Sequence, residues 1–224
     1  MNNKISRLFE YVYSIPKSFY FCFRMLPFRQ ALRLPVLVRY NTKLSSLKGH
    51  IKLDSCRLGG GRIGFGNVGV FDKKYQRTVL YLDGNIRVYG DFFIGYGSRI
   101  QVGKNGCLEF GKNFHITACS TILAFKKIKF GCDVLISWDV LIMDTDFHNI
   151  YDRNTLKSYS CEKEIMIGNH VWIGCRSVLL KGCQISDDSI IAANTVVTKS
   201  FEEDSVIIAG TPANIMKRNV SWKE

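Results

Sequence analysis

The feature that most constrains this chain is a repeat of six residues. Aliphatic side chains recur at every sixth position, at Ile167, Ile173, Leu179, Ile185, Ile191 and Val197. This period fits neither the turn of an α-helix nor the simple alternation of a strand. Three six-residue segments make one triangular coil with the aliphatic residue pointing inward, and stacked coils bury a ladder that no single segment could bury alone. The repeat therefore predicts a mainly β solenoid, a parallel β-helix.

The same frame extends upstream with interruptions. It returns at Phe110, Ile116, Ile122 and Ile128, slips by two, and continues at Phe130, Ile136 and Ile142, with Ile94 and Ile100 earlier. We expect bulges or short loops at the slips, and small residues at the corners of the coils. Before residue 90 the signal fades into a Gly-rich stretch, 59–66. That stretch predicts irregular early coils rather than a phosphate-binding loop, because a GK[ST] ending and a helical period are both missing.

The repeat also divides the chain. Three of the four prolines, Pro16, Pro27 and Pro35, precede it, and the next is Pro212. We predict a basic and aromatic helical segment at 1–45, a β-helix at 46–210 and a tail at 211–224. The ladder breaks between Ile142 and Ile165, which predicts a loop extruded at 143–164. A loop extruded from a rigid solenoid is a natural place for function.

The formal net charge of +12 predicts an anionic partner such as a nucleic acid, a membrane surface or a phosphorylated small molecule. Residues 1–40 hold seven Lys or Arg and one acid, Glu10, interleaved with aromatic residues. That mixture is typical of an interfacial segment more than of a helix that reads DNA, so no nucleic-acid partner is predicted. Two interpretations stay open: peripheral membrane contact through residues 1–40, or a helical cap whose basic residues face water while its aromatics pack on the main domain.

The remaining composition indicates a soluble or membrane-peripheral protein. No stretch approaches about eighteen uncharged apolar residues, which argues against a spanning helix. Lys4 and Arg7 are not followed by an apolar run that ends in a small-residue cleavage site, which argues against a cleaved signal peptide. Eight cysteines show no CxxC pair, so neither a disulfide framework nor a zinc knuckle is predicted. We expect one main domain with reduced thiols in the cytoplasm.

Three motifs give the chain a family resemblance. They are GNHVWIG at 168–174, AANTVVTK at 192–199 and AGTPA at 209–213. In this order and spacing they resemble the hexapeptide-repeat acetyltransferases of the galactoside and maltose acetyltransferase type, over roughly residues 90–218. Within that family the chain looks closest to the sugar-modifying enzymes of bacterial surface polysaccharide pathways. The resemblance implies a left-handed β-helix, acetyl-CoA as co-substrate, a saccharide acceptor, and a homotrimer with its active site between neighbouring prisms.

His148 is the predicted catalytic base. Removing a proton from a hydroxyl that attacks a thioester needs a group with a pKa near neutrality, and imidazole suits that task. His148 lies in the extruded loop, where the resemblance implies a catalytic histidine. Asp144 or Asp146 could orient its ring, although a backbone carbonyl would serve as well.

The other three histidines have weaker claims. His170 is interpreted as a hydrogen-bonded or solvated corner residue, and His115 and His50 are weaker candidates still. A zinc site of carbonic-anhydrase type needs histidines close together in sequence, whereas His115, His148 and His170 are 33 and 22 residues apart. No metal is therefore expected.

The resemblance also implies donor and acceptor positions. On the donor side it implies Cys175, Ala193, Thr198, Lys199, Asn214 and Lys217. Asn214 departs from the basic residue common in relatives, so the phosphate contact of coenzyme A could shift to Lys217 or Arg218. An acceptor-side asparagine of the galactoside-type enzymes falls near Thr117 here. Trp172 either borders a substrate cleft or caps a corner, and Cys183 is interpreted as core packing.

These observations predict an acetyl-CoA-dependent O-acetyltransferase acting on a sugar hydroxyl of a saccharide or of a cell-surface polysaccharide precursor. Two alternatives remain. One is N-acetylation of a nucleotide-linked amino sugar, in which the positive charge would meet a diphosphate. The other is a noncatalytic β-helix used for assembly or membrane docking. The presence of His148 in the extruded loop favours the enzyme.

Overall fold

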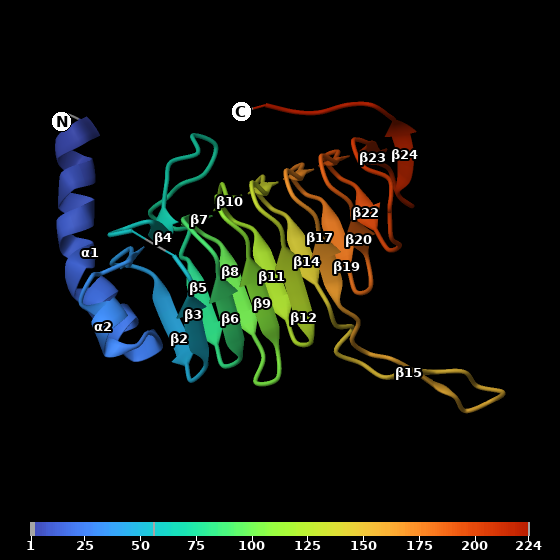
Figure 1. Ribbon diagram of the computed structural model, residues 1–224, viewed down its shortest axis with the longest axis horizontal. Coiled ribbons are helices and arrows are strands. Elements are labelled where there is room, and N and C mark those ends of the chain that lie inside the picture. The colour runs from blue at the N-terminus through green and yellow to red at the C-terminus, as the bar shows by residue number, and fades with distance from the viewer. Residues whose placement is uncertain (1–2, 56, 224) are drawn as a thin grey trace.

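The computed structural model describes residues 3–55 and 57–223, with side chains described from residue 8 onward. Three sheets form the faces of a prism, and α1 (Asn3–Met25) and α2 (Phe28–Ala31) lie across one end of it (Figure 1). Strands pass from one sheet to the next, and each pairs in parallel with its counterpart one coil later. This is the parallel β-helix that the repeat predicts. Cys56 lies outside the described residues, as do the side chains of Lys4 and Arg7.

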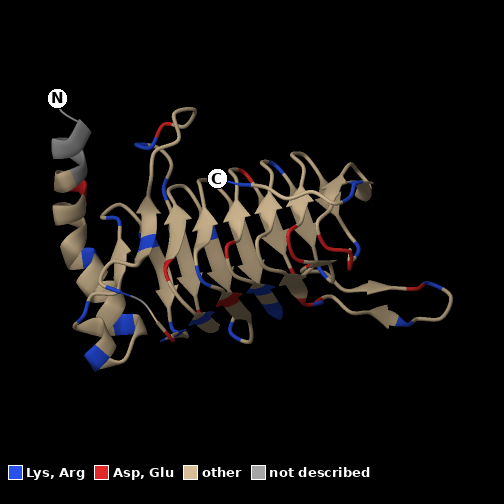
Figure 2. Ribbon diagram, turned by 45° about the horizontal axis from the view of Figure 1, so that its top comes forward, with Lys and Arg blue, Asp and Glu red and all other residues tan. Residues whose placement is uncertain are grey.

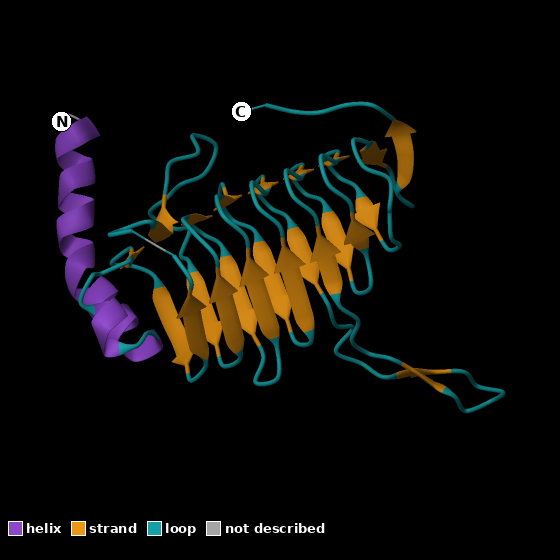
Figure 3. Cartoon of the chain, viewed as in Figure 1, coloured by secondary structure: helices purple, strands orange, loops and turns teal. Residues whose placement is uncertain are grey.

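The sheets contain short strands joined by tight corners (Figure 3). The first sheet contains, in spatial order, β1 (Val36–Val38), β4 (Gly61–Phe65), β7 (Phe92–Gly95), β10 (Phe114–Ile116), β13 (Leu135–Ile136), β18 (Trp172–Ile173), β21 (Ile190–Ile191), β23 (Ile207–Ala209) and β24 (Asn214–Lys217). The second contains β2 (Lys43–Leu47), β5 (Val79–Leu82), β8 (Arg99–Val102), β11 (Thr121–Ala124), β14 (Leu141–Met143), β19 (Val178–Leu180) and β22 (Val196–Val197). The third contains β3 (His50–Leu53), β6 (Asn85–Val88), β9 (Cys107–Phe110), β12 (Lys127–Phe130), β17 (Ile165–Ile167) and β20 (Gln184–Ile185).

The predicted aliphatic ladder runs through the interior of the prism. In the first sheet the stacked residues are Ile94, Ile116, Ile136, Ile173 and Ile191, each at most 3% exposed. In the second they are Ile100, Ile122, Ile142, Leu179 and Val197. Branched side chains fit such stacked, pleated surfaces, and each coil buries its ladder residue against the next. Burial of Cys183 within this core agrees with its interpretation as packing, and burial raises the pKa of its thiol to about 12.

The slip between Ile128 and Phe130 is not a bulge. Both side chains belong to the unbroken strand β12, and both are buried. The strand pairs with β9 and β17 without any shift of register. The expectation of an irregularity there was wrong. A four-residue strand points two alternate side chains inward. The six-residue pattern passes from the first of these inward residues, Ile128, to the second, Phe130, and the backbone of the strand is continuous.

The corners between the third and first sheets contain two kinds of residue. Gly111, Gly131 and Gly168 stack so closely that a Cβ on Gly111 would lie 2.2 Å from the carbonyl oxygen of Gly131. Two residues further on, left-handed backbone is adopted mainly by Asn and Asp, which tolerate it best after glycine. These residues are Asn113, Asp133, His170 and Asp188, with φ of 56°, 57°, 53° and 55°. His170 is therefore a corner residue, as predicted.

Helix α1 closes the first end of the prism. Tyr40 N–H donates to Ser14 Oγ at 3.0 Å, Val38 N–H donates to Ser18 Oγ at 2.8 Å, and Cys22 Sγ lies 3.3 Å from the carbonyl oxygen of Val36. Residues four apart on a helix rise about 6 Å, close to the roughly 6.6 Å between alternate strand residues. Three side chains of the helix therefore satisfy the backbone groups at the edge of the sheet that another strand would have used.

The β-helix begins earlier than predicted. Strand β1 starts at Val36 and pairs in register with β4, so the boundary at residue 45 falls inside the first coil. The Gly-rich stretch supplies β4, whose pairing with β7 shifts register between Ile63 and Phe65. These early coils escape the six-residue pattern because their connections are long and unequal. Within the described residues, no helix is long and apolar enough to cross a membrane.

The far end is closed by a reversal of the chain. Strand β24 runs antiparallel to β23, and the tail then returns along the prism (Figure 1). Val220 N–H donates to the carbonyl oxygen of Ser205 at 3.0 Å, and Trp222 Nε1 donates to that of His170 at 2.8 Å. The tail thus contacts the corners of two earlier coils.

Candidate active site

The extruded arm leaves the prism where β14 ends at Met143 and returns where β17 begins at Ile165. Its outer part is an antiparallel hairpin of β15 (Ile150–Tyr151) and β16 (Ser158–Tyr159), which projects away from the prism (Figure 1). Asp152 holds the hairpin tip by accepting hydrogen bonds from the N–H groups of Asn154 and Thr155, and these bonds lower its pKa. The arm is a folded element with its own hydrogen bonds.

Asp144 anchors the base of the arm. Its buried carboxylate accepts hydrogen bonds from the backbone N–H groups of Phe125 and Lys126, at 2.8 and 2.9 Å. Burial raises the pKa of this carboxyl, while these N–H groups act in the opposite direction. Both oxygens are engaged with the corner between β11 and β12. A free carboxylate at this position to orient His148, as the sequence suggested, is not what the structure contains.

Asp146 is engaged as well. Its Oδ2 lies 2.5 Å from Lys181 Nζ, which follows β19. The same ammonium donates to the carbonyl oxygen of Ser160 at 2.5 Å on the returning limb of the arm. Lys181 therefore ties both limbs to the next coil. Asp144 and Asp146 both help to fix the base of the arm, and an orienting contact of Asp146 with His148 stays a prediction.

His148 follows this anchored base and has an exposed side chain. Phe147, directly before it, packs edge-on against Phe125 with ring centroids 4.9 Å apart. Within the described part of the chain, no hydrogen bond or ion pair involves the His148 ring. An imidazole that is exposed but carried by a fixed backbone is free to take a proton from a bound substrate.

The residues predicted for the donor side lie mainly at two corners. Lys199 and Thr198 follow β22 at the corner between the second and third sheets, and Lys199 Nζ lies 3.2 Å from Asn214 Oδ1. Ser200 Oγ lies 3.3 Å from the carbonyl oxygen of Gly182, one residue after Lys181. The foot of the arm, Lys181 and Lys199 therefore lie at the same corner on successive coils. Lys217 ends β24 and is exposed, whereas Arg218 pairs with Glu203 at 2.8 Å.

Cys175 and Ala193 lie at the other corner, between the first and second sheets. They stand on successive coils, where Asn194 N–H donates to the carbonyl oxygen of Cys175 at 3.0 Å. Thr117 follows β10 on the same side, and its hydroxyl oxygen is buried without a described partner. Trp172 donates from Nε1 to Ser137 Oγ at 3.1 Å. Within one chain, the predicted site residues therefore lie mostly at the two edges of the second sheet, whereas Trp172 and Lys217 lie on the first sheet.

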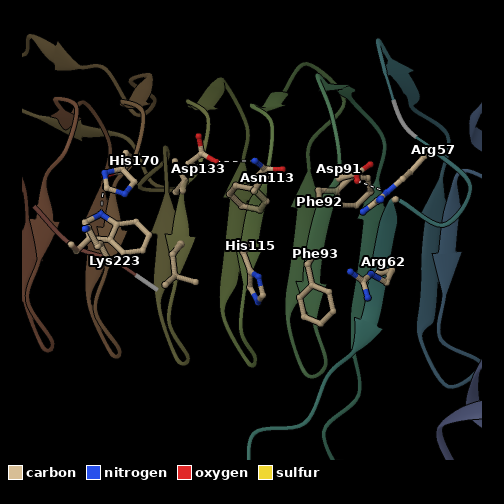
Figure 4. Close-up of a pocket in the computed structure, with 15 residues that line it drawn as sticks. Arg57, Arg62, Asp91, Phe92, Phe93, Asn113, His115, Asp133, His170 and Lys223 are labelled. Atoms are coloured by element: carbon tan, nitrogen blue, oxygen red, sulfur yellow. Dashed lines mark hydrogen bonds and ion pairs between the residues drawn. The ribbon is translucent and has the colours of Figure 1, made fainter. Parts of the chain in front are cut away.

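An open groove of about 640 Å³ lies along the outer side of the first sheet (Figure 4). Its floor carries Arg62, Phe93 and His115 from neighbouring coils, with the guanidinium of Arg62 5.5 Å from the Phe93 ring centre and the Phe93 and His115 ring centres 4.7 Å apart. One end is formed by His170 and Trp222, whose rings stack at 4.5 Å, while Nδ1 of His170 lies 2.7 Å from Asp188. His148 is not among the residues that line it.

Comparisons with known proteins agree with this architecture. Residues 164–199 match the profile of the bacterial transferase hexapeptide (six repeats) family. The polysialic acid O-acetyltransferase of Escherichia coli O1:K1 / APEC is 29% identical over 138 residues, 62% of this chain and 42% of that protein. Galactoside O-acetyltransferase of Escherichia coli (strain K12) is 32% identical over 125 residues, 56% of this chain and 57% of that protein. The chain is therefore similar to hexapeptide-repeat O-acetyltransferases, and residues 164–199 carry the repeat itself.

The structural comparison shows the fold of the chain. The crystal structure of the polySia-specific acetyltransferase NeuO aligns with a TM-score of 0.53 at 22% identity, covering 84% of this chain and 80% of that one. The left-handed parallel β-helix predicted from the resemblance is confirmed. The chain spans about half the length of the two curated relatives, 42% and 57%.

Several features of this chain escaped sequence reasoning. The contact of Lys181 with Asp146 joins residues from different coils, and Trp222 lies in a tail with no repeat. The groove is made by outward residues, which the inward ladder does not constrain. One signal was available: Arg62, Phe93 and His115 all stand directly before an inward isoleucine of the first sheet.

Proposed function

We propose that this protein is an acetyl-CoA-dependent O-acetyltransferase that modifies a hydroxyl of a saccharide or of a cell-surface polysaccharide precursor. The two curated relatives are named for O-acetylation of polysialic acid and of galactosides. The observation that carries the proposal is the exposed imidazole of His148 on an arm whose base is fixed by Asp144 and by the Lys181–Asp146 ion pair. Because the foot of the arm is fixed, the backbone of His148 is positioned while its ring remains free to move.

His148 has a simple role in this reaction. Its neutral imidazole accepts the proton as the acceptor oxygen attacks the thioester carbonyl carbon. When the carbon–sulfur bond breaks, the imidazolium returns that proton to the departing sulfur, so the products are the acetyl ester and coenzyme A. The exposed Lys199 ammonium and Asn214 amide, in contact at one corner, suit the polar donor substrate. The small side chains of Cys175 and Ala193 leave the backbone of the other corner open.

Assembly as a homotrimer would complete the site. The outer face of the second sheet carries an apolar, half-buried row in the single chain, with Leu123, Met143 and Leu180 adjacent in register. This face lies between the corner of Cys175 and the corner of His148. Packing it against a neighbouring prism would bring the first corner of one subunit to the second corner of the next. We also propose a cytoplasmic location, consistent with seven described free cysteines.

The groove of the first sheet suits the parts of a saccharide remote from the reacting hydroxyl. Sugars pack on aromatic rings and hydrogen-bond through their hydroxyls, and Phe93, Trp222, His115, Asn113 and Asp133 offer both kinds of contact. Replacing Phe93 by Ala should raise KM for an oligosaccharide while kcat stays nearly constant, because the contact is equal in ground and transition states. A fall in kcat with unchanged KM would remove the groove from the acceptor site.

The decisive experiment is a thiol-release assay with acetyl-CoA, comparing wild type with His148→Ala. The acceptor panel should contain neutral and acidic oligosaccharides and nucleotide-linked amino sugars. We expect saccharide-dependent release of coenzyme A that falls by about 10²- to 10⁴-fold in the variant. His50→Ala, which changes an exposed histidine on the third sheet, is the matched control and should retain full activity.

Each outcome of that assay has a clear meaning. Retained activity in His148→Ala would show that the base is another residue. Release of coenzyme A only with amino sugars, yielding an amide, would replace O-acetylation by N-acetylation. Failure to bind acetyl-CoA at all would favour a noncatalytic solenoid.

A further inference from the structure

The outer surface of α1 has an unusual composition for a helix on a protein surface. From residue 8 to residue 24, every exposed residue of the helix except Arg24 is apolar or aromatic. The exposed residues are Leu8, Phe9, Val12, Tyr13, Ile15, Pro16, Phe19, Tyr20 and Phe23, and they cover about half of the helix circumference at ~100° per residue. We call this surface the α1 outer face.

From residue 8 onward, the polar residues of α1 other than Arg24 are turned inward instead. Ser14 and Ser18 bind the backbone of β1, and Lys17 Nζ donates to the carbonyl oxygens of Tyr40 and Thr42. Glu10 lies against Arg39 and Lys73, both within ion-pair distance. A usual surface helix buries its apolar stripe and shows its polar residues to water. In α1 most apolar residues face water and most polar ones face the protein, because the inner side of the helix has to hydrogen-bond the free backbone groups along β1.

The sequence allowed a cap whose aromatics pack on the main domain, and the structure bears out only part of it. Tyr11 stacks on Phe65 at 4.8 Å and Phe21 is fully buried. Phe9, Tyr13 and Tyr20, in contrast, are 54%, 66% and 61% exposed. The α1 outer face thus stays uncovered in the single chain. Contiguous exposed apolar surface of this kind marks an interaction site.

The charge beside this face is of one sign. Arg24, Arg29 and Arg33 are exposed on the last turn of α1 and around α2. The one acid among the described residues of 8–40, Glu10, is neutralised by its internal ion pairs. Figure 2 shows basic positions gathered where α1 ends and around α2. A surface that joins aromatic side chains to unpaired cations is complementary to lipid headgroups that carry negative charge.

The position of the helix fits a flat partner. α1 lies across the end of the prism rather than along one of its three sheet faces (Figure 1). Its long axis therefore can lie parallel to a surface that meets the end of the prism, which is how interfacial helices bind membranes. The sheet faces remain free for other contacts.

We propose that the α1 outer face docks the protein on an anionic lipid bilayer, with its aromatic side chains in the interface and Arg24, Arg29 and Arg33 at the headgroups. The docking surface is separate from His148 and from both donor corners. The proposal therefore does not depend on acetyl transfer.

Sedimentation of the full-length protein with vesicles tests the proposal. Vesicles of phosphatidylcholine alone are compared with vesicles that also contain phosphatidylglycerol, at low and high salt. We expect binding to the anionic vesicles that weakens as salt screens the arginines. The variant Phe9→Ser, Phe19→Ser, Phe23→Ser should bind at least about tenfold more weakly. Replacing Arg24, Arg29 and Arg33 by Gln should weaken binding by about fivefold per residue.

Matched controls lie on the arm. Ile150, Tyr151 and Tyr159 are 52%, 61% and 53% exposed, so the triple Ser variant removes similar apolar exposure from another element. This variant should bind vesicles like wild type. All variants should keep the wild-type circular dichroism, because the replaced side chains are exposed. The α1 variants should also retain acetyl transfer to a soluble acceptor, which separates failure of docking from failure of the proposed enzyme.

Two results would overturn the proposal. The first is absence of wild-type binding to anionic vesicles, and the second is equal binding by wild type and the α1 triple variant. If wild type does not bind vesicles and the triple variant changes oligomeric state, the α1 outer face is a contact between copies of this chain.

Discussion

Asp144 is a buried carboxylate with opposing influences on its pKa. Burial, the larger effect, raises the pKa above the ordinary value of 3.8, while N–H groups at Phe125 and Lys126 favour the ionised form. Because the folded state holds the proton more tightly, the contribution of Asp144 to stability is fully present below the unfolded pKa and is lost as pH rises through the folded pKa.

This sign gives a test with Asp144→Asn, which cannot titrate. Urea unfolding of both proteins should show the stability of wild type falling relative to the variant as pH rises above 3.8 through the raised pKa. The difference should become constant once the carboxyl is fully ionised. A difference that moves the other way would mean that the N–H groups, rather than burial, control this carboxyl.

Sequence proximity misled the prediction for this residue. Asp144 stands four positions before His148, which suggested an orienting partner. Its carboxylate instead binds backbone groups 18 and 19 residues away, on the preceding coil. In a solenoid the nearest neighbours of a corner residue lie one coil away, so contacts in space do not follow short distances along the chain.

At the scale of elements, the interface between α1 and β1 should be sensitive to single atoms. Ser18→Ala removes the acceptor of the buried Val38 N–H and should cost about 1–3 kcal/mol of unfolding free energy. Ser200→Ala, at an exposed serine that also makes a hydrogen bond, should change stability by less than about 0.5 kcal/mol. Urea unfolding curves measure both, and equal small effects would mean that water replaces the Ser18 hydroxyl.

The elements differed in how far they could be predicted. The coils from Phe92 to Val197 were predictable because their inward residues recur at nearly fixed spacing, so one pattern specifies many contacts. The helical cap was not predictable, because Ser14, Ser18 and Cys22 each contact a different backbone group and no repeated sequence pattern marks these contacts. The exposed aromatics of α1 resemble core residues in sequence, and only the demand of the sheet edge for polar partners explains why they face outward.

At the scale of the whole molecule, the second sheet should mediate assembly. Leu123→Glu combined with Leu180→Glu should convert the proposed trimer into monomers, since charges would be buried without partners. Acetyl transfer should be lost with it, because the corners of Cys175 and His148 would no longer meet. Sedimentation velocity and the thiol-release assay measure both properties.

A matched control is Lys129→Glu, on the outer side of the third sheet, which should change neither assembly nor activity. A wild-type monomer with full activity would contradict the shared site. It would mean that one chain holds every residue the reaction needs.

Because α1 closes one end of the prism, the number of coils sets the distance between α1 and the arm. Successive coils lie about 4.8 Å apart along the prism axis, and the arm leaves in the fifth coil, after β14. With α1 on a bilayer, the arm would stand about 20 Å further from the headgroups than the first coil does. The number of coils between cap and arm then acts as a ruler for the height at which acceptor hydroxyls are reached, and inserting one whole coil would raise that height by a single fixed step.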